Sequence, residues 1–89
     1  MRTKVNITKL IMKKIRLGFI GAGFNGQIGF LQNFFNNDKC IIFGLAEARD
    51  NLRKKVSRKY SIKNQYSSHK DLAKDINEYD GIVIVTKRN

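Results

Sequence analysis

The sequence contains no proline and no tryptophan, and it has a single cysteine and a single histidine. One cysteine, Cys40, excludes a disulfide within the chain, and together with the lone histidine, His69, it is too little for a Cys/His zinc site. No apolar run approaches the roughly 18 to 20 residues that a membrane-spanning helix needs. A cytoplasmic location fits these absences best. We expect Cys40 to pack at the start of a strand and His69 to lie on the surface.

Acidic residues are also scarce. The sequence has seven Asp and Glu and eighteen Lys and Arg, which gives a formal net charge of +11. A basic surface attracts phosphates, so nucleic-acid binding is one interpretation. The densest basic group, however, lies on one predicted helix whose buried stripe is Leu52, Val56 and Tyr60. We interpret this basic group as a solvated helix face, with an acidic partner or a missing part of the same protein as alternatives and nucleic acid disfavoured. The group consists of Arg53, Lys54, Lys55, Arg58 and Lys59.

With 89 residues the chain is shorter than most domains, and a chain of this size buries only about two-thirds of its unfolded surface. We therefore expect a marginal core. The first eleven residues lack the long apolar stretch and cleavage site of a secretory signal. We interpret residues 1–12 as an extension outside the fold, with Met12 as an alternative start, and residues 13–89 as one continuous unit without repeats or linkers.

Four segments are predicted to be strands. Residues 14–20 alternate apolar side chains with others, and residues 40–46 form a short apolar run of the kind buried on both faces of a parallel sheet. Residues 81–86 form another apolar strand, and a shorter strand is expected near residues 65–67.

Helices are predicted between these strands. Residues 25–36 keep helical spacing of their apolar side chains, and the basic helix runs to about Tyr60. Asp50 is expected to cap that helix, because its side chain can accept hydrogen bonds from the unpaired amides of the first turn.

A third helix is predicted to open at Ser68, which with Asp71 resembles a capping box, and to include Leu72 and Ile76. Strands that alternate with helices require crossover connections and hence a parallel sheet. The order β-α-β-α-β-α-β therefore predicts a doubly wound, Rossmann-like α/β fold. A complete domain of this type has further strands, so we expect residues 13–89 to be a truncated, partial Rossmann domain.

The segment between the first strand and the first helix has the spacing G-x-G-x-x-G, formed by Gly21, Gly23 and Gly26. In this motif the first glycine permits a tight turn, the second lets the backbone approach a pyrophosphate, and the third lets the helix pack closely on the sheet. The free amides and the positive end of the helix dipole then bind the phosphates. The structural alternative is a tight turn without a ligand.

An acidic residue, Glu47, follows about 20 residues after the glycine motif, at the end of the second strand. Its carboxylate can accept hydrogen bonds from the adenosine ribose hydroxyls of NAD, whereas it would repel the 2'-phosphate of NADP. Arg49 can offset this preference by pairing with a phosphate or stacking on adenine. NAD is favoured and NADP remains open. The structural alternatives are an exposed pair of Glu47 with Arg49, and a plain surface charge at Arg49.

Several segments together resemble the glucose-fructose oxidoreductase, inositol dehydrogenase and rhizopine-catabolism (Gfo/Idh/MocA) family. They are residues 14–23 (KIRLGFIGAG), the strand from Ile41 to Glu47 leading into Arg49, residues 56–60 (VSRKY) and residues 80–86 (DGIVIVT). The resemblance covers nearly all of residues 13–89. The glycine motif is common to many Rossmann enzymes, whereas its combination with a helix ending in tyrosine and a strand ending in threonine is more specific.

This resemblance implies an NAD(P)-dependent oxidoreductase acting on a sugar, polyol or related hydroxy compound. It implies pyrophosphate contacts from the backbone around Phe24 and Asn25, ribose contacts from Glu47, and contacts near the nicotinamide from the turn after Thr86. One departure is Lys87, which stands where the family usually has proline directly after the threonine.

A larger departure concerns catalysis. The family's catalytic lysine lies in a Glu-Lys-Pro motif, which this chain lacks, and the substrate-binding domain that follows in the family is also missing. Hydride transfer needs a substrate held against the nicotinamide with a base in reach. We therefore expect the chain to bind the dinucleotide without turning over substrate, and we assign no catalytic residue.

Two other hypotheses stay open. One is a non-catalytic module that senses a nucleotide or binds a partner, including another copy of itself, through an exposed sheet edge and the basic helix. The other is a small α/β domain without a ligand.

Overall fold

The computed structural model of the protein describes residues 14–22 and 31–85. Four strands form one sheet: β1 (Ile15–Ile20), β2 (Cys40–Ala46), β3 (Asn64–Tyr66) and β4 (Gly81–Ile84). Their order across the sheet is β3-β2-β1-β4, and every neighbouring pair is parallel. The four strands were expected from the sequence, and the parallel α/β architecture is confirmed.

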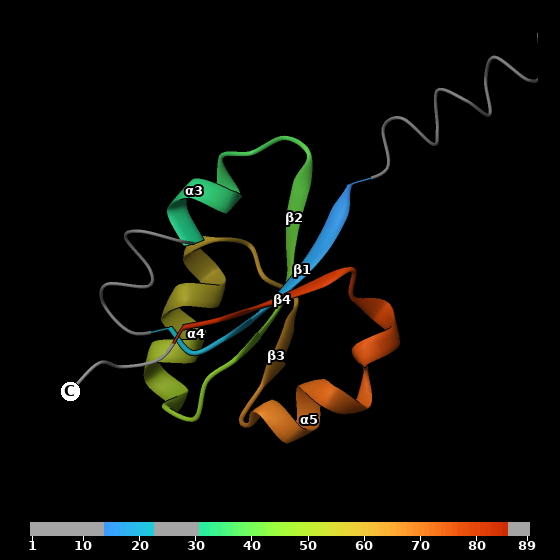
Figure 1. Ribbon diagram of the computed structural model, residues 1–89. Helices are drawn as coiled ribbons and strands as arrows, with labels where there is room; N and C mark the ends of the chain where they lie inside the picture. Colours follow the sequence, from blue (N-terminus) through green and yellow to red (C-terminus); the bar gives the residue numbers. More distant parts are fainter. Residues whose placement is uncertain (1–13, 23–30, 86–89) are drawn as a thin grey trace, which may run out of the picture.

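Helices connect the strands and cover both faces of the sheet (Figure 1). The segments α3 (Gln32–Phe35) and α4 (Asp50–Lys59) lie on one face. The opposite face carries α5 (His69–Lys74) and the short 3-10 helix η2 (Ile76–Glu78). This three-layer arrangement places the ends of β1, β2 and β3 at one edge, where the connecting loops leave the sheet.

The core lies between the sheet and the α3/α4 layer. Phe19, Leu45 and Val56 are fully buried there, and the ring of Phe19 meets that of Phe34 edge-on at 5.7 Å between centroids. Val56 and Tyr60 are buried and Leu52 packs beside them, as the spacing of four predicts. Within α4, Lys54, Lys55, Arg58 and Lys59 are exposed, as expected of a solvated basic face. The prediction was wrong for Arg53, whose side chain is only 12% exposed because it pairs with Asp50 and the backbone of Glu47.

A tyrosine covers the other face of the sheet where two glycines pair. Gly18 of β1 and Gly44 of β2 are neighbours in the parallel register. The ring of Tyr79 lies over both, so a Cβ at Gly44 would collide with its hydroxyl and a Cβ at Gly18 would come within 2.9 Å of its ring. Phe43 meets the same ring edge-on at 5.3 Å. The missing side chains thus make the slot that Tyr79 fills.

Three other local predictions were wrong. Asp50 is the first residue of α4 rather than its cap, because the carboxylate of Glu47 holds the amide of Arg49, which stands at the N-cap in extended conformation. Ile76 lies outside α5, because that helix ends at Lys74, and it begins η2 with 47% of its surface exposed. The first half of β2 is not buried on both faces, because Ile41 is 44% exposed.

Other expectations hold. Cys40 is the first residue of β2 and packs against the core, and His69 is exposed at the start of α5. The side chain of Ser68 caps α5 by accepting a hydrogen bond from the amide of Asp71. Among the residues that the structure describes, none of the helices is long and apolar enough to cross a membrane.

Candidate functional site

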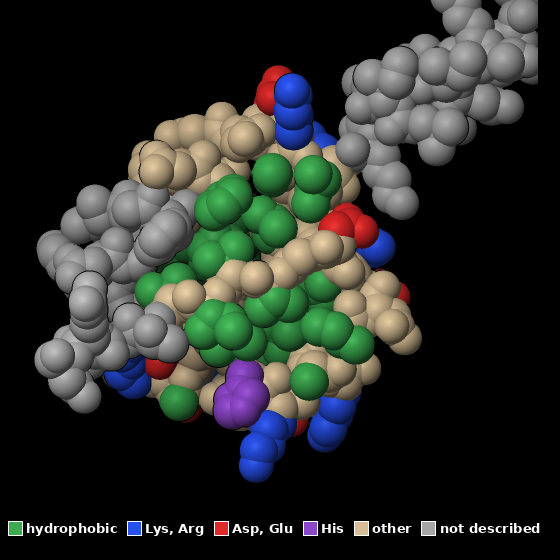
Figure 2. Space-filling view, viewed as in Figure 1, with side chains coloured by type: hydrophobic (Ala, Val, Ile, Leu, Met, Phe, Trp, Pro, Cys, Tyr) green, Lys and Arg blue, Asp and Glu red, His purple; other side chains and the backbone are tan. Residues whose placement is uncertain are grey.

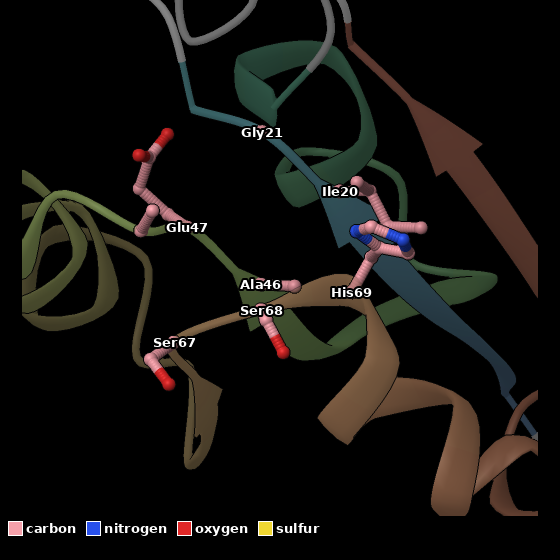
Figure 3. A pocket seen from close by; sticks show the side chains of 8 residues that line it. Ile20, Gly21, Ala46, Glu47, Ser67, Ser68 and His69 are labelled. Atoms are coloured by element: carbon pink, nitrogen blue, oxygen red, sulfur yellow. The ribbon is translucent and has the colours of Figure 1, made fainter.

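A pocket of about 240 Å³ opens at the carboxyl edge of the sheet, where β1, β2 and β3 end (Figure 3). In doubly wound folds, ligands bind outside the carboxyl ends of the strands. The pocket is lined by Ile20, Gly21, Ala46, Glu47, Ala48, Ser67, Ser68 and His69.

The end of β1 can turn here only because residue 21 is glycine. Gly21 has φ +94°, a conformation that side chains rarely adopt, and its amide donates to the carbonyl of Ala46 at 2.8 Å. A Cβ at this position would collide with the backbone oxygen of Val85. Since the amide of Val85 donates to the carbonyl of Ile20 at 2.8 Å, the segment after β4 lies directly against the turn. This fits the tight turn that the motif requires of its first glycine.

The carboxylate of Glu47 is buried beside this turn, with only 7% of the residue exposed. One oxygen, Oε1, accepts from the amide of Ala22 at 3.0 Å and from Nη2 of Arg49 at 2.9 Å. The other, Oε2, accepts from the amide and from Nε of Arg49, both at 2.9 Å. Through these hydrogen bonds, Glu47 connects the turn after β1 to the end of β2. The pairing with Arg49 considered from the sequence is present, but the carboxylate is buried rather than exposed.

These donors keep Glu47 ionised. The hydrogen bond from the Arg49 side chain, helped by the two backbone amides, lowers the pKa of Glu47 from 4.5 to about 2, although burial opposes the change. The same pairing raises the pKa of Arg49. A carboxylate of such low pKa is a poor general base at neutral pH, since proton transfer works best with a pKa near the operating pH. Its chemistry here is to accept hydrogen bonds.

A second arginine, Arg53, supports the same loop and was not predicted as a site residue. Its Nη1 donates to the backbone oxygen of Glu47 at 2.9 Å and pairs with Oδ1 of Asp50 at 2.7 Å. Its side chain is only 12% exposed, unlike the four exposed basic residues of α4. Its role could have been predicted from the sequence, because a residue near the start of α4 lies close to the end of β2.

Residues 67–69 also line the pocket, although the sequence predicted Ser67 as the end of a strand, Ser68 as a helix cap and His69 as a surface residue. Ser67, Ser68 and His69 follow β3 and border the pocket together with Glu47 (Figure 3). They offer hydroxyl groups and an exposed imidazole. Their position directly after a parallel strand could have predicted this, because the carboxyl ends of parallel strands lie at one edge of the sheet.

The predicted site residues divide into two groups. Gly21 and Glu47 line the pocket, and Arg49 contacts the carboxylate of Glu47. The remainder of the predicted set lies outside the described residues: Gly23, Phe24, Asn25, Gly26 and Thr86. Within 14–22 and 31–85, no cluster of His, Cys, Asp and Glu is suited to hold a metal ion.

Comparisons with known proteins give no independent family assignment. No protein-family model matches the chain, and no curated protein is significantly similar to it. The parallel sheet covered by helices is consistent with a Rossmann-like fold.

Proposed function

We propose that this chain is the dinucleotide-binding part of an NAD(P)-dependent oxidoreductase of the Gfo/Idh/MocA type, acting on a sugar, polyol or related hydroxy compound. The observation that carries the proposal is the buried, ionised carboxylate of Glu47, fixed against the glycine turn by the amide of Ala22. A carboxylate at this point of a doubly wound sheet is suited to the ribose hydroxyls of NAD.

The geometry of the pocket at the carboxyl edge of the sheet supports the same proposal. The first glycine of the motif has the positive φ that its turn needs, and the pocket lies between that turn, Glu47 and the loop after β3. At about 240 Å³ the pocket is smaller than the roughly 300–1,000 Å³ of most small-molecule sites. It suits one half of a dinucleotide, the adenosine half beside Glu47.

The residues fit the cofactor in the following way. Glu47 would accept the ribose hydroxyls, Ser67, Ser68 and His69 would border the adenosine, and the backbone of residues 23–26 would hold the pyrophosphate. The turn after Thr86 would lie near the nicotinamide. When bound, the cofactor supplies hydride transfer, and the described residues bind and orient it. We assign no catalytic base within this chain.

Calorimetric titration of the purified chain with NAD and NADP tests the proposal. We expect weak saturable binding that favours NAD, because Glu47 repels a 2'-phosphate. Gly23→Val, which puts a side chain where the backbone should meet the pyrophosphate, should abolish binding. Arg58→Met, at an exposed position in the last turn of α4, should leave it unchanged. Saturable binding that Gly23→Val does not affect would refute the proposed site.

A second candidate function is partner binding without a nucleotide. It draws support from the exposed basic face of α4 and from β4, an edge strand whose Ile84 is 64% exposed. Figure 2 shows apolar side chains gathered on the side of the molecule where β4 lies. A salt-dependent shift with mixed nucleic acid, or concentration-dependent self-association, without any response to NAD would favour this function.

A further inference from the structure

The carboxylate of Glu47 has no hydrogen-bonding capacity left for a ligand. An ionised carboxylate offers about four lone-pair sites, two on each oxygen. On Oε1 they are taken by the amide of Ala22 and Nη2 of Arg49, and on Oε2 by the amide and Nε of Arg49. A ribose can bind to Glu47 only if one of these donors leaves.

The donors differ in how readily they can leave. The two amides belong to the backbone at the end of β1 and at the start of α4, and their positions are fixed by the fold. The two guanidinium donors belong to a side chain with 63% of its surface exposed. The exposed guanidinium can turn into solvent, but its departure removes two hydrogen bonds from a buried carboxylate, so the donors of an incoming ligand must replace them.

Removal of the guanidinium would free one lone pair on each oxygen, on the side of the carboxylate that the bidentate fork now occupies. Two neighbouring acceptors of this kind match a ligand with two adjacent hydroxyl groups, such as the 2'- and 3'-hydroxyls of a ribose. A bidentate guanidinium and a vicinal diol thus present the same pattern of two parallel donors to one carboxylate.

We propose that the Arg49 guanidinium is a placeholder for the ribose diol of the bound nucleotide and that it must leave Glu47 before the diol can bind. This inference rests on the proposed function. Arg49 is then a specificity-determining residue: it competes with the hydroxyls for Glu47, so it reduces the affinity that the chain gains from a ribose diol.

Two probes that differ only in the diol isolate this effect: ADP and 2',3'-dideoxy-ADP. Titration of the wild-type chain and of Arg49→Met with both probes gives the ratio of their dissociation constants in each protein. We expect the preference for ADP to increase at least about twofold in Arg49→Met, because the substitution removes a competing ion pair that is exposed at the arginine but buried at the carboxylate. Changes in phosphate attraction or base stacking affect both probes and cancel in the ratio.

Arg58→Met is the matched control, since it removes the same charge from an exposed position and should leave the ratio unchanged. In the wild-type chain, the Nε–H resonance of Arg49 in a nitrogen-proton correlation spectrum should shift on saturation with ADP and stay in place with 2',3'-dideoxy-ADP. This second measurement does not depend on the stability of the variant.

The outcomes separate this inference from the proposed function. If the chain binds NAD and ADP but the ratio is the same in wild type and Arg49→Met, or if ADP saturates the chain without moving the Arg49 resonance, the placeholder role is wrong and the nucleotide site stands. If neither NAD nor ADP binds at millimolar concentration, both are wrong.

Discussion

The amide of Ala22 donates a hydrogen bond of 3.0 Å to the carboxylate of Glu47, although 25 positions separate the two residues in the chain. The bond joins the turn after β1 to the end of β2, and it directs one oxygen of a buried anion at the glycine motif. It also makes the local fold and the proposed ligand site depend on the same carboxylate, so that stability and binding can be tested with the same variants.

Gly21→Ala should destabilise the protein. The residue has φ +94° and a Cβ there would meet the carbonyl of Val85, so the substitution combines backbone strain with a collision. Strain of this kind costs about 1–3 kcal/mol in the free energy of unfolding. Urea denaturation measures the loss. Gly81→Ala is the control, because its Cβ would meet only the Leu17 side chain, at 3.1 Å; an equal loss in both variants would contradict the account of the turn.

The stability of the protein should fall as the pH decreases from about 4.5 towards 2, in part because Glu47 is protonated. Its pKa is lowered from 4.5 to about 2 in the folded chain, chiefly by the hydrogen bond from Arg49, so the stabilisation is complete above the unfolded pKa and disappears through the folded one. The shift sets an upper limit of about 3 kcal/mol, and the exposure of Arg49 reduces the expected effect to about 1 kcal/mol.

Denaturation midpoints of wild type and Glu47→Gln across this pH range check the assignment to Glu47. Glutamine cannot titrate, so the variant should be less stable at pH 6 and should lose less stability than wild type on acidification. Parallel curves for the two proteins would show that other carboxylates cause the acid sensitivity.

Gly44→Ala should destabilise the sheet through its contact with Tyr79. The added Cβ would collide with the tyrosine hydroxyl, and overpacking of this kind typically costs about 1–3 kcal/mol. In a Tyr79→Leu background the same substitution should cost much less, because the colliding ring is gone. Chemical denaturation of the four proteins gives the coupling energy between the two sites. Additive effects would mean that Tyr79 is not what requires a glycine at position 44.

Ser68→Ala should reduce the free energy of unfolding by about 1 kcal/mol, because the Ser68 hydroxyl accepts a hydrogen bond from the amide of Asp71 at the start of α5. Ser67→Ala provides a neighbouring control. Ser67 is exposed, and its hydroxyl donates to the Asp71 carboxylate instead of accepting from a backbone amide of the helix. Thermal unfolding should separate the two variants clearly. Equal melting temperatures would remove Ser68 as the cap.

Much of the fold follows from short-range patterns. The apolar runs of β2 and β4 and the spacing of Leu52, Val56 and Tyr60 on α4 predicted the element order and the parallel sheet, because burial against neighbouring layers dictates those patterns. The spacing of the G-x-G-x-x-G pattern and of the acidic residue after it singled out Gly21 and Glu47, which line the same pocket in the structure.

The rest depends on contacts between distant positions. The slot for Tyr79 exists only because Gly18 and Gly44 are partners in the strand register, which no local pattern indicates. The helical spacing of Leu72 and Ile76 predicted a helix that includes both, whereas α5 ends before Ile76. The capping role given to Asp50 failed because Glu47 acts on Arg49 from outside the helix. The sequence raised a pair of Glu47 with Arg49 as an alternative, but no local pattern indicates that the carboxylate is buried and that Arg49 supplies three of its four hydrogen bonds.

The most direct test of the central claim is a nitrogen-proton correlation spectrum of the full chain titrated with NAD. A nucleotide bound at the carboxyl edge should shift the amide signals of Gly21, Ala22, Arg49 and His69 together, with one saturation curve, and should leave exposed positions of α4 such as Lys55 unchanged. Saturation with shifts confined to the basic face of α4, or no shift at millimolar NAD, would contradict a nucleotide site at this edge of the sheet.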